Sequence, residues 1–291
     1  YPHQDLAAKM QPFTIFREDV GKKIRMLDGS KSSDPDGIHP LMLKSCAHEV
    51  SWPLYLIFCK SFSTGEVPEQ WKKSIVVPIF KGGSRSDPTK YRPISLTSLC
   101  CRTMERLVAD HIVDYLETNS ILSPNQFAFR TGYSTEDQLV LTYTEVITKV
   151  DQGYIVDMIY LDFAKAFDTI SHRILLDKLR CLGFDNTLLN WIQAFLTGRT
   201  MQVSTAGVNS RSFPVDSGVP QGSVLGPVLF NIYINFITPG LDCPFKIFAD
   251  DFKLYLNYER TNLTHGITSL QRNLDYVNSV RRSLNRSLNP S

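Results

Sequence analysis

Two short apolar runs, separated by a pair of acidic residues, restrict the fold of this sequence more than any other feature. The runs are 245–248 and 252–256, and Ala249-Asp250-Asp251 lies between them. Large apolar residues on both sides of so short a connection predict a β-hairpin with two carboxylates at its tip. Aspartate is also common in turns because its side chain bonds the local backbone, so this pair alone is more typical of a turn than of a functional site.

A third aspartate follows an apolar run elsewhere in the chain. Residues 155–161 are rich in β-branched residues and predict a buried strand that ends at Asp162, although a strand-end or helix-capping role would also suit this residue. If this strand lies beside the hairpin, Asp162 and Asp250 are neighbours. Two carboxylates about 4 Å apart repel by roughly 4 kcal/mol at an effective dielectric of about 20. Such a cluster needs a cation or a shared proton, and Mg²⁺, which combines carboxylates with substrate phosphates, suits it.

The remaining apolar patterns alternate between strand and helix, which predicts a mixed α+β fold. A strand is expected over 75–80, where Pro78 favours an edge position because it has no amide hydrogen to donate. Helical spacing recurs over 104–116 and at Leu175, Leu179 and Leu182, and the long apolar stretch 224–237 predicts a buried helix. Turns or loops are expected at 32–37, 81–88 and 217–223.

The turn at 217–223 precedes the predicted helix at 224–237 and contains Gln221-Gly222. A glycine-containing turn at the start of a helix can bind an anion through free amide hydrogens. The same residues also suit a plain helix-initiating turn, so both interpretations stay open.

Composition and charge exclude several classes of protein. With 43% apolar and 21% charged residues in 291, the chain is neither disordered throughout nor collagen-like, and no stretch reaches the roughly 18 apolar residues of a membrane span. The six cysteines form no C-x-x-C pair, which indicates reduced, mostly buried thiols in an intracellular setting. The net charge is only +2, yet 70–106 holds eight basic and two acidic residues. This local excess suits either a polyphosphate partner or a solvated surface.

Five motifs occur in a fixed order along the chain, at 34–38, 90–96, 161–168, 217–227 and 248–251. The run Gly-Val-Pro-Gln-Gly-Ser in the fourth is the most specific of them. Together the motifs resemble the reverse transcriptase domain of non-LTR retrotransposons of the jockey or CR1 type. The resemblance covers roughly residues 30–290. Phe248 stands where that family more often has Tyr, and Asn235-Phe236 where it often has Asn-Asp.

The resemblance implies the α+β fold of a right-hand polymerase with fingers and a ferredoxin-like palm, and with the thumb missing. Residues 1–100 and 171–225 would form the fingers, and 101–170 and 226–291 a palm truncated at its C-terminal end. The chain stops at the string 288–291, which in the family a Lys usually follows, ahead of the rest of the palm and the thumb. Because the thumb grips the duplex, we expect weaker affinity for nucleic acid than in a full-length enzyme.

The resemblance also assigns site residues. Asp162, Asp250 and Asp251 match the catalytic triad that binds two Mg²⁺ ions, for which Mn²⁺ is a substitute. Asp168 is expected to cap a helix or to support the fold rather than to bind metal.

A second group matches the nucleotide-binding residues of the family. Phe167 matches the aromatic steric gate against a ribose 2′-hydroxyl, and Gln221 and Gly222 match residues that contact the incoming nucleotide and the template–primer. Arg92 matches a triphosphate-binding arginine, with Lys81 a second candidate. Without the resemblance, Phe167 would be read as an ordinary core aromatic, and Arg92 and Lys81 as part of a solvated basic loop.

The implied function is that of an RNA-directed DNA polymerase, which transfers a nucleotide from a dNTP to a primer 3′-hydroxyl. Its expected partners are an RNA template, a DNA primer and dNTPs, with no membrane. An RNA-copying RNA polymerase and a catalytically silent remnant of a mobile element stay open as alternatives. The intact carboxylates favour a polymerase, whereas the end of the chain at residue 291 favours the silent remnant.

Overall fold

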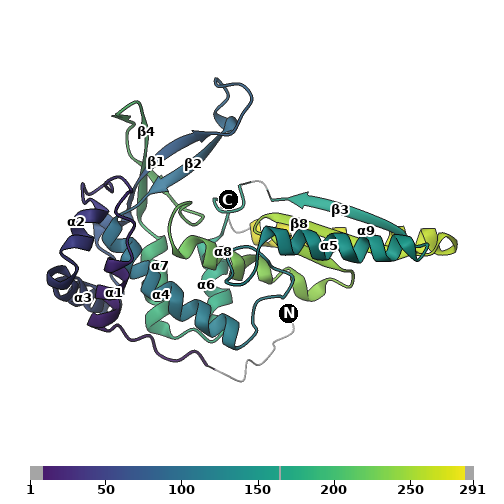
Figure 1. Ribbon diagram of the computed structural model, residues 1–291, viewed down its shortest axis with the longest axis horizontal. Helices are drawn as coiled ribbons and strands as arrows, with labels where there is room; N and C mark the ends of the chain where they lie inside the picture. The colour runs from purple at the N-terminus through teal and green to yellow at the C-terminus, as the bar shows by residue number, and fades with distance from the viewer. Residues whose placement is uncertain (1–8, 164, 286–291) are drawn as a thin grey trace.

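A computed structural model describes residues 9–163 and 165–285 of the chain. It has a helical body, a projection built on the first β-sheet, and an elongated arm in which two long helices flank a second sheet (Figure 1). Ala164, which belongs to one of the five motifs, and the terminal string 288–291 lie outside the described residues.

Seven helices build the body, and they pack through apolar faces whose spacing the sequence predicts. They are α1 (Arg17–Arg25), α2 (Pro40–Ser45), α3 (Ala47–Thr64), α4 (Leu99–Thr118), α6 (His172–Cys181), α7 (Asn186–Leu196) and α8 (Leu225–Asn235). The predicted helix 104–116 is confirmed within α4, where each apolar position of the pattern is buried. Leu175 and Leu179 of α6 are fully buried, and α8 confirms the predicted helix after residue 224.

The first sheet has the order β2-β1-β4-β5, and β6 also pairs with β4. Its strands are β1 (Lys73–Phe80), β2 (Tyr91–Leu96), β4 (Arg199–Thr205), β5 (Val208–Asn209) and β6 (Phe213–Val215). The predicted strand at 75–80 is confirmed, but its predicted edge position is wrong, because β4 pairs with 73–76 on the side away from β2. Pro78 lies beyond that pairing, opposite Pro93 of β2, so its missing amide hydrogen breaks no bond to β4.

The second sheet confirms the predicted strand and hairpin. Its antiparallel order is β3-β8-β7, with β3 (Ile155–Asp162), β7 (Phe245–Phe248) and β8 (Asp251–Tyr258). Two helices cover it, α5 (Thr135–Asp151) and α9 (Leu263–Asn285). Side chains alternate along β8. Lys253 therefore bonds to Gln138 of α5 on one face, while the ring of Tyr258 lies against Gly266 of α9 on the other.

Helix α5 turns its polar side to the sheet. Gln138 and Thr142 are buried, whereas its apolar residues Leu139, Val140, Tyr143, Ile147 and Val150 are exposed. Glu145 adds an ion pair to Lys246 at 3.0 Å and a hydrogen bond from Tyr255. Polar contacts therefore fix α5 on this face of the sheet.

The connections agree with the predicted turns and loops at 32–37, 81–88 and 217–223. In the described part of the chain, four short 3₁₀ helices also lie in connections: η1 (Glu69–Lys72), η2 (Pro88–Lys90), η3 (Thr238–Gly240) and η4 (Arg260–Asn262). All six cysteines are free thiols, but only Cys100, Cys101 and Cys243 are buried, so the expectation of mostly buried thiols is wrong. Within the described part of the chain, no helix combines the length and apolar character needed to cross a membrane.

Candidate active site

Two of the three predicted acidic residues face each other across neighbouring strands. Asp162, the last residue of β3, is paired in register with Asp251, the first residue of β8, and both are exposed. The Cα atoms of opposed residues in an antiparallel ladder are about 4.5–5.5 Å apart. The sequence-based pairing of Asp162 with Asp250 is therefore shifted by one residue, because Ala249 and Asp250 form the turn.

Asp250 lies at the hairpin tip, where it is half-buried. Burial raises the pKa of its carboxyl group, and the negative charges of Asp251 and Asp162 raise it further. Its own amide and the positive charge of Arg92 oppose this rise in pKa. Because Arg92 belongs to β2, the end of the second sheet lies within electrostatic reach of the first.

These three residues suit a hard divalent cation in their chemistry and backbone placement. All their donor atoms are carboxylate oxygens, the ligands that Mg²⁺ prefers. However, among the described residues no group of three or more His, Cys, Asp or Glu side chains lies close enough together to hold a metal ion. Exposed carboxylates change rotamer readily, and Mg²⁺ takes part of its coordination from substrate phosphates and water. The strand register therefore places these carboxylates near one another, but the described side chains do not form a preformed metal site.

The turn that holds Gln221 and Gly222 is bonded to both neighbouring segments. The carbonyl of Gln221 accepts a 2.7 Å bond from the amide of Ser95 in β2, and its side-chain amide donates to Asp168 at 3.1 Å. Gly222 has a φ of +121°, and a Cβ there would lie 2.5 Å from the carbonyl oxygen of Ser95. Glycine is thus needed both for the backbone conformation and for the close approach to β2.

Glu105 anchors the helix behind this turn. This residue of α4 is fully buried, and its carboxylate accepts bonds from the amides of Val224 (2.7 Å) and Leu225 (3.0 Å). The next amide, Gly226, donates to the hydroxyl of Ser223. Because these three amides are already bonded, they are not free to bind an anion. Anion binding by the amides of Gln221 and Gly222 stays a prediction. Sequence reasoning missed Glu105 because a single glutamate in an apolar helix gives no pattern.

Phe167 is half-buried beside the same turn. Its ring stacks on Phe230 of α8 at 4.5 Å between centroids and meets Phe129 edge-on at 6.1 Å. Asp168 is not a helix cap, since α6 begins after Ser171; it instead holds Gln221. The segment around Phe167 also packs backbone to backbone on the turn, where Val219 donates to the carbonyl of Phe167 at 2.9 Å.

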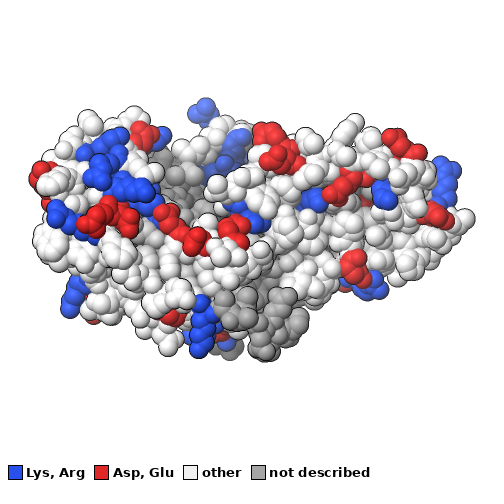
Figure 2. All heavy atoms as spheres, turned by 60° about the horizontal axis from the view of Figure 1, so that its bottom comes forward, with Lys and Arg blue, Asp and Glu red and all other residues white. Residues whose placement is uncertain are grey.

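The two basic candidates occupy different places in the β1–β2 hairpin. Arg92 is exposed, is paired with Ile79 of β1, and acts on the carboxyl group of Asp250 through its charge. Lys81 is exposed in the connecting loop, where its amide donates to the carbonyl of Lys90. On the face drawn in Figure 2, basic and acidic side chains are intermixed, in agreement with the small net charge.

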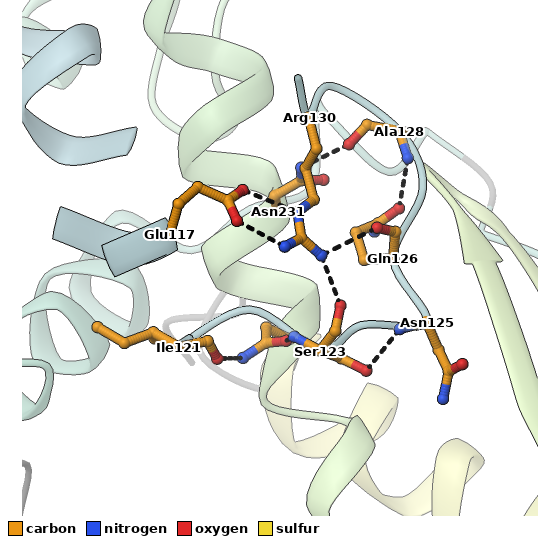
Figure 3. Close-up of polar contacts among 9 residues, drawn as sticks. Glu117, Ile121, Ser123, Asn125, Gln126, Ala128, Arg130 and Asn231 are labelled. Atoms are coloured by element: carbon orange, nitrogen blue, oxygen red, sulfur yellow. Dashed lines mark hydrogen bonds and ion pairs between the residues drawn. The ribbon is translucent and has the colours of Figure 1, made fainter. Parts of the chain in front are cut away.

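Residues 121–130, which we call the strap, run between α4, α8 and the hairpin, and sequence reasoning did not single them out. Figure 3 shows the side chain of Arg130 between Glu117 and the backbone of the strap. It binds both carboxylate oxygens of Glu117 in α4, at 2.8 and 2.6 Å, and donates to the carbonyls of Ser123 and Gln126. Two asparagines of α8, Asn231 and Asn235, bond to the backbone of the strap.

Comparison with known proteins identifies the family of the chain. Residues 72–291 match the family model described as "Reverse transcriptase (RNA-dependent DNA polymerase)". The match covers more than half of the chain, and the chain belongs to the reverse transcriptase family.

Two relatives within that family come from mobile elements of Drosophila melanogaster. The chain is 32% identical over 230 residues to the "Probable RNA-directed DNA polymerase from transposon BS" of Drosophila melanogaster, over 78% of this chain and 25% of the relative. It is 30% identical over 217 residues to the "RNA-directed DNA polymerase from mobile element jockey" of the same organism, over 74% and 24%. The predicted resemblance is confirmed, and the chain spans about a quarter of the length of these relatives.

Proposed function

We propose that this chain is the catalytic part of an RNA-directed DNA polymerase, which copies an RNA template by extending a DNA primer with dNTPs. The observation that supports this most strongly is the opposed pair Asp162–Asp251 with Asp250 at the adjoining tip, in a chain of the reverse transcriptase family. Three carboxylates delivered from two distant segments are hard to explain by turn chemistry alone.

In this proposal Asp162, Asp250 and Asp251 hold two Mg²⁺ ions. When bound, the ions would lower the barrier to attack of the primer 3′-hydroxyl on the α-phosphate and stabilise the leaving pyrophosphate. Phosphoryl transfer depends on positioning and on charge neutralisation. The burial that raises the pKa of Asp250 makes its negative charge costly without a cation, which favours occupation of the site.

The neighbouring residues bind the nucleotide in this proposal. Arg92 lies within electrostatic reach of Asp250, and there it would neutralise the triphosphate, with Lys81 at the adjoining loop as a weaker contact. Gln221 and Gly222 would contact the base and the template–primer from a turn that Ser95 and Asp168 hold in place. Phe167 would exclude a ribose 2′-hydroxyl with a half-buried ring that Phe230 supports by stacking.

We assign the polymerase subdomains as the sequence predicts. The fingers are 1–100 and 171–225 and the palm is 101–170 and 226–291, with no segment assigned to a thumb. The sheet β3-β8-β7 would be the centre of the palm. The ferredoxin-like arrangement of the palm stays a prediction, and the pair α5 and α9 does not by itself form it, because these helices contact opposite faces of this sheet.

Extension of a DNA primer on an RNA template tests the proposal. We expect incorporation of dNTPs that requires Mg²⁺, prefers dNTPs to NTPs and is lost in Asp250→Ala. Preference for NTPs would instead indicate an RNA-copying RNA polymerase.

One observation favours the second candidate, a chain that binds nucleic acid without polymerising: within the described residues the carboxylates do not converge into a group that could hold an ion. Binding of a primed template without Mg²⁺-dependent incorporation would support this candidate.

A further inference from the structure

We infer that Gln126 is a positioning residue for Asp250: its side chain completes an edge strand that holds the hairpin tip in place. The inference rests on the proposed function of Asp250 as a metal ligand. It concerns a residue 124 positions away in sequence, which the motifs around the aspartates do not include.

The strap is hydrogen-bonded to β7 along the edge of this strand that does not pair with β8. The amide of Ile247 donates to the carbonyl of Asn125 at 2.8 Å, and the carbonyl of Ile247 accepts from the amide of Phe127 at 3.0 Å. The next group on that edge, two residues along, is the amide of Ala249. Here the backbone of the strap has turned away, and the side-chain oxygen of Gln126 accepts the bond instead, at 3.4 Å. Gln126 thus extends the pairing to the residue before Asp250.

The tip needs such support for two reasons. Ala249 has a φ of +54°, in the left-handed region that costs a residue with a Cβ about 1–2 kcal/mol. Asp250 is also pushed by the like charges of Asp251 and Asp162. Without an external bond, both effects favour a different tip conformation, in which Asp250 would no longer lie beside the end of the ladder.

Gln126 is suited to this task because its side chain is buried and its oxygen is bonded, although its side-chain nitrogen has no hydrogen-bond partner among the described residues. Its side chain is 2% exposed, and the same oxygen accepts the amide of Ala128 at 3.0 Å (Figure 3). Arg130 fixes the backbone on either side through the carbonyls of Ser123 and Gln126, and Asn231 holds the carbonyl of Ala128 at 2.8 Å. Contacts with α4 and α8 therefore position the strap around the side-chain oxygen of Gln126. This oxygen contacts the hairpin tip through its bond with the amide of Ala249.

The test uses the whole chain labelled with ¹⁵N-alanine, so that amide exchange at Ala128 and Ala249 is observed directly by NMR, together with Mn²⁺ binding by electron paramagnetic resonance. Gln126→Met removes the side-chain oxygen that accepts the bond and keeps nearly the same volume. If this variant folds poorly, Gln126→Asn serves instead, because its side chain is shorter by one methylene and its oxygen no longer reaches Ala249. Gln126→Glu keeps an acceptor. Ser61→Ala is the stability-matched control, because it deprives the buried indole of Trp191 of its partner in the helical body.

We expect exchange at Ala249 to rise, and Mn²⁺ affinity to fall, by about twofold to fivefold in Gln126→Met and Gln126→Asn, because a bond of 3.4 Å is at the weak end of the range for one hydrogen bond. Gln126→Glu should keep the amide of Ala249 protected from exchange. Ser61→Ala should change neither this exchange nor the Mn²⁺ affinity, although it lowers the stability of the chain as Gln126→Met does.

Unchanged exchange at Ala249 in the Met and Asn variants would overturn the inference, as would an equal loss of Mn²⁺ affinity in Ser61→Ala. A chain that binds no Mn²⁺ even with a dNTP and a primed template present would refute the proposed function instead. Exchange at Ala249 would still decide whether Gln126 holds the tip.

Discussion

Asp162 and Asp251 form a directly opposed pair of like charges at the end of the ladder between β3 and β8. Like charges opposite each other in a sheet oppose its stability, by the same order as the roughly 0.2–1 kcal/mol that favourable cross-strand pairs contribute. Neither residue belongs to an ion pair among the described residues. The register therefore places repulsion where an apolar or oppositely charged pair would have been more stable.

Asp162→Asn should separate function from stability. We expect incorporation to fall by about a hundredfold or more, comparable to the loss of a charge-stabilising group in other active sites. In the absence of metal, the melting temperature should stay the same or rise by about 1–2 °C, because the opposed charges are relieved. Primer extension and a thermal melt in a metal-free buffer measure both effects. A marked fall in the metal-free melting temperature would show that Asp162 serves the fold instead.

Asp250→Asn should change how stability depends on pH. The pKa of Asp250 is raised in the folded chain, chiefly by burial, above the ordinary value of about 3.9 that the unfolded chain has. Between those two values the folded state holds the proton more tightly, so Asp250 lowers stability as the pH rises through this window. The Asn variant loses this dependence. Its melting temperature relative to the unaltered chain should therefore increase as the pH rises above the ordinary carboxyl pKa of about 3.9 without metal, and a constant difference would contradict the shift.

Local patterns in the sequence predict the elements that carry the site. Strand β3, the hairpin of β7 and β8, and helices α4 and α8 follow from spacing within each segment, because burial of one face imposes that spacing. The pairing of Asp162 with Asp251 rather than with Asp250 does not follow, since it depends on how many residues the turn takes up.

Contacts between distant segments could not be predicted, because the pattern within one segment does not identify the segment that it contacts. Glu105 binds amides 119 and 120 residues away, and Gln126 binds one 123 residues away; neither belongs to a periodic pattern or a motif that the sequence analysis used. The internal position of β1 depends on β4, which the sequence analysis did not predict. The roles of such residues can be identified only from the folded structure, where their partners lie beside them.

Lys178→Met should stabilise the chain in a pH-dependent way. Burial lowers the pKa of Lys178 to about 7, and its ammonium lies 3.9 Å from the ring centroid of Phe236. An unfolded lysine, with a pKa of about 10.4, keeps its proton over a range where the folded one releases it. The stability of the unaltered chain therefore rises between about pH 7 and pH 10, by roughly 3 kcal/mol from this group.

The Met variant lacks that dependence, so its advantage in urea unfolding should be largest near pH 7 and shrink towards pH 10. A difference between the two proteins that does not vary with pH would rule out a neutral buried lysine.

Phe167→Val should admit ribonucleotides if the ring is the gate. The smaller side chain leaves space beside the sugar, and we expect the preference for dNTPs over NTPs in primer extension to fall by about tenfold or more. Phe230→Leu is the matched control, because it disturbs the same stacked pair at its buried member and leaves the half-buried ring of Phe167 in place. If both variants keep the preference, or lose it equally, Phe167 contributes only packing.

Gly222→Ala should reduce activity more than its backbone conformation alone explains. The new Cβ would lie 2.5 Å from the carbonyl oxygen of Ser95, so the turn and β2 must separate, and the bond between the amide of Ser95 and the carbonyl of Gln221 is lost with them. Gly153→Ala provides the control. Gly153 also has a positive φ, +85°, but a Cβ there has open space within 4 Å, so this variant has the conformational cost without the clash.

We expect Gly153→Ala to lose about 1 kcal/mol of stability and to retain its KM for dNTPs. Gly222→Ala should raise that KM by about tenfold or more, since Gln221 moves away from the place that Ser95 and Asp168 give it. Steady-state extension kinetics and urea unfolding of both variants separate the two contributions. Equal KM values in the two variants would mean that contact between the turn and β2 does not position the nucleotide.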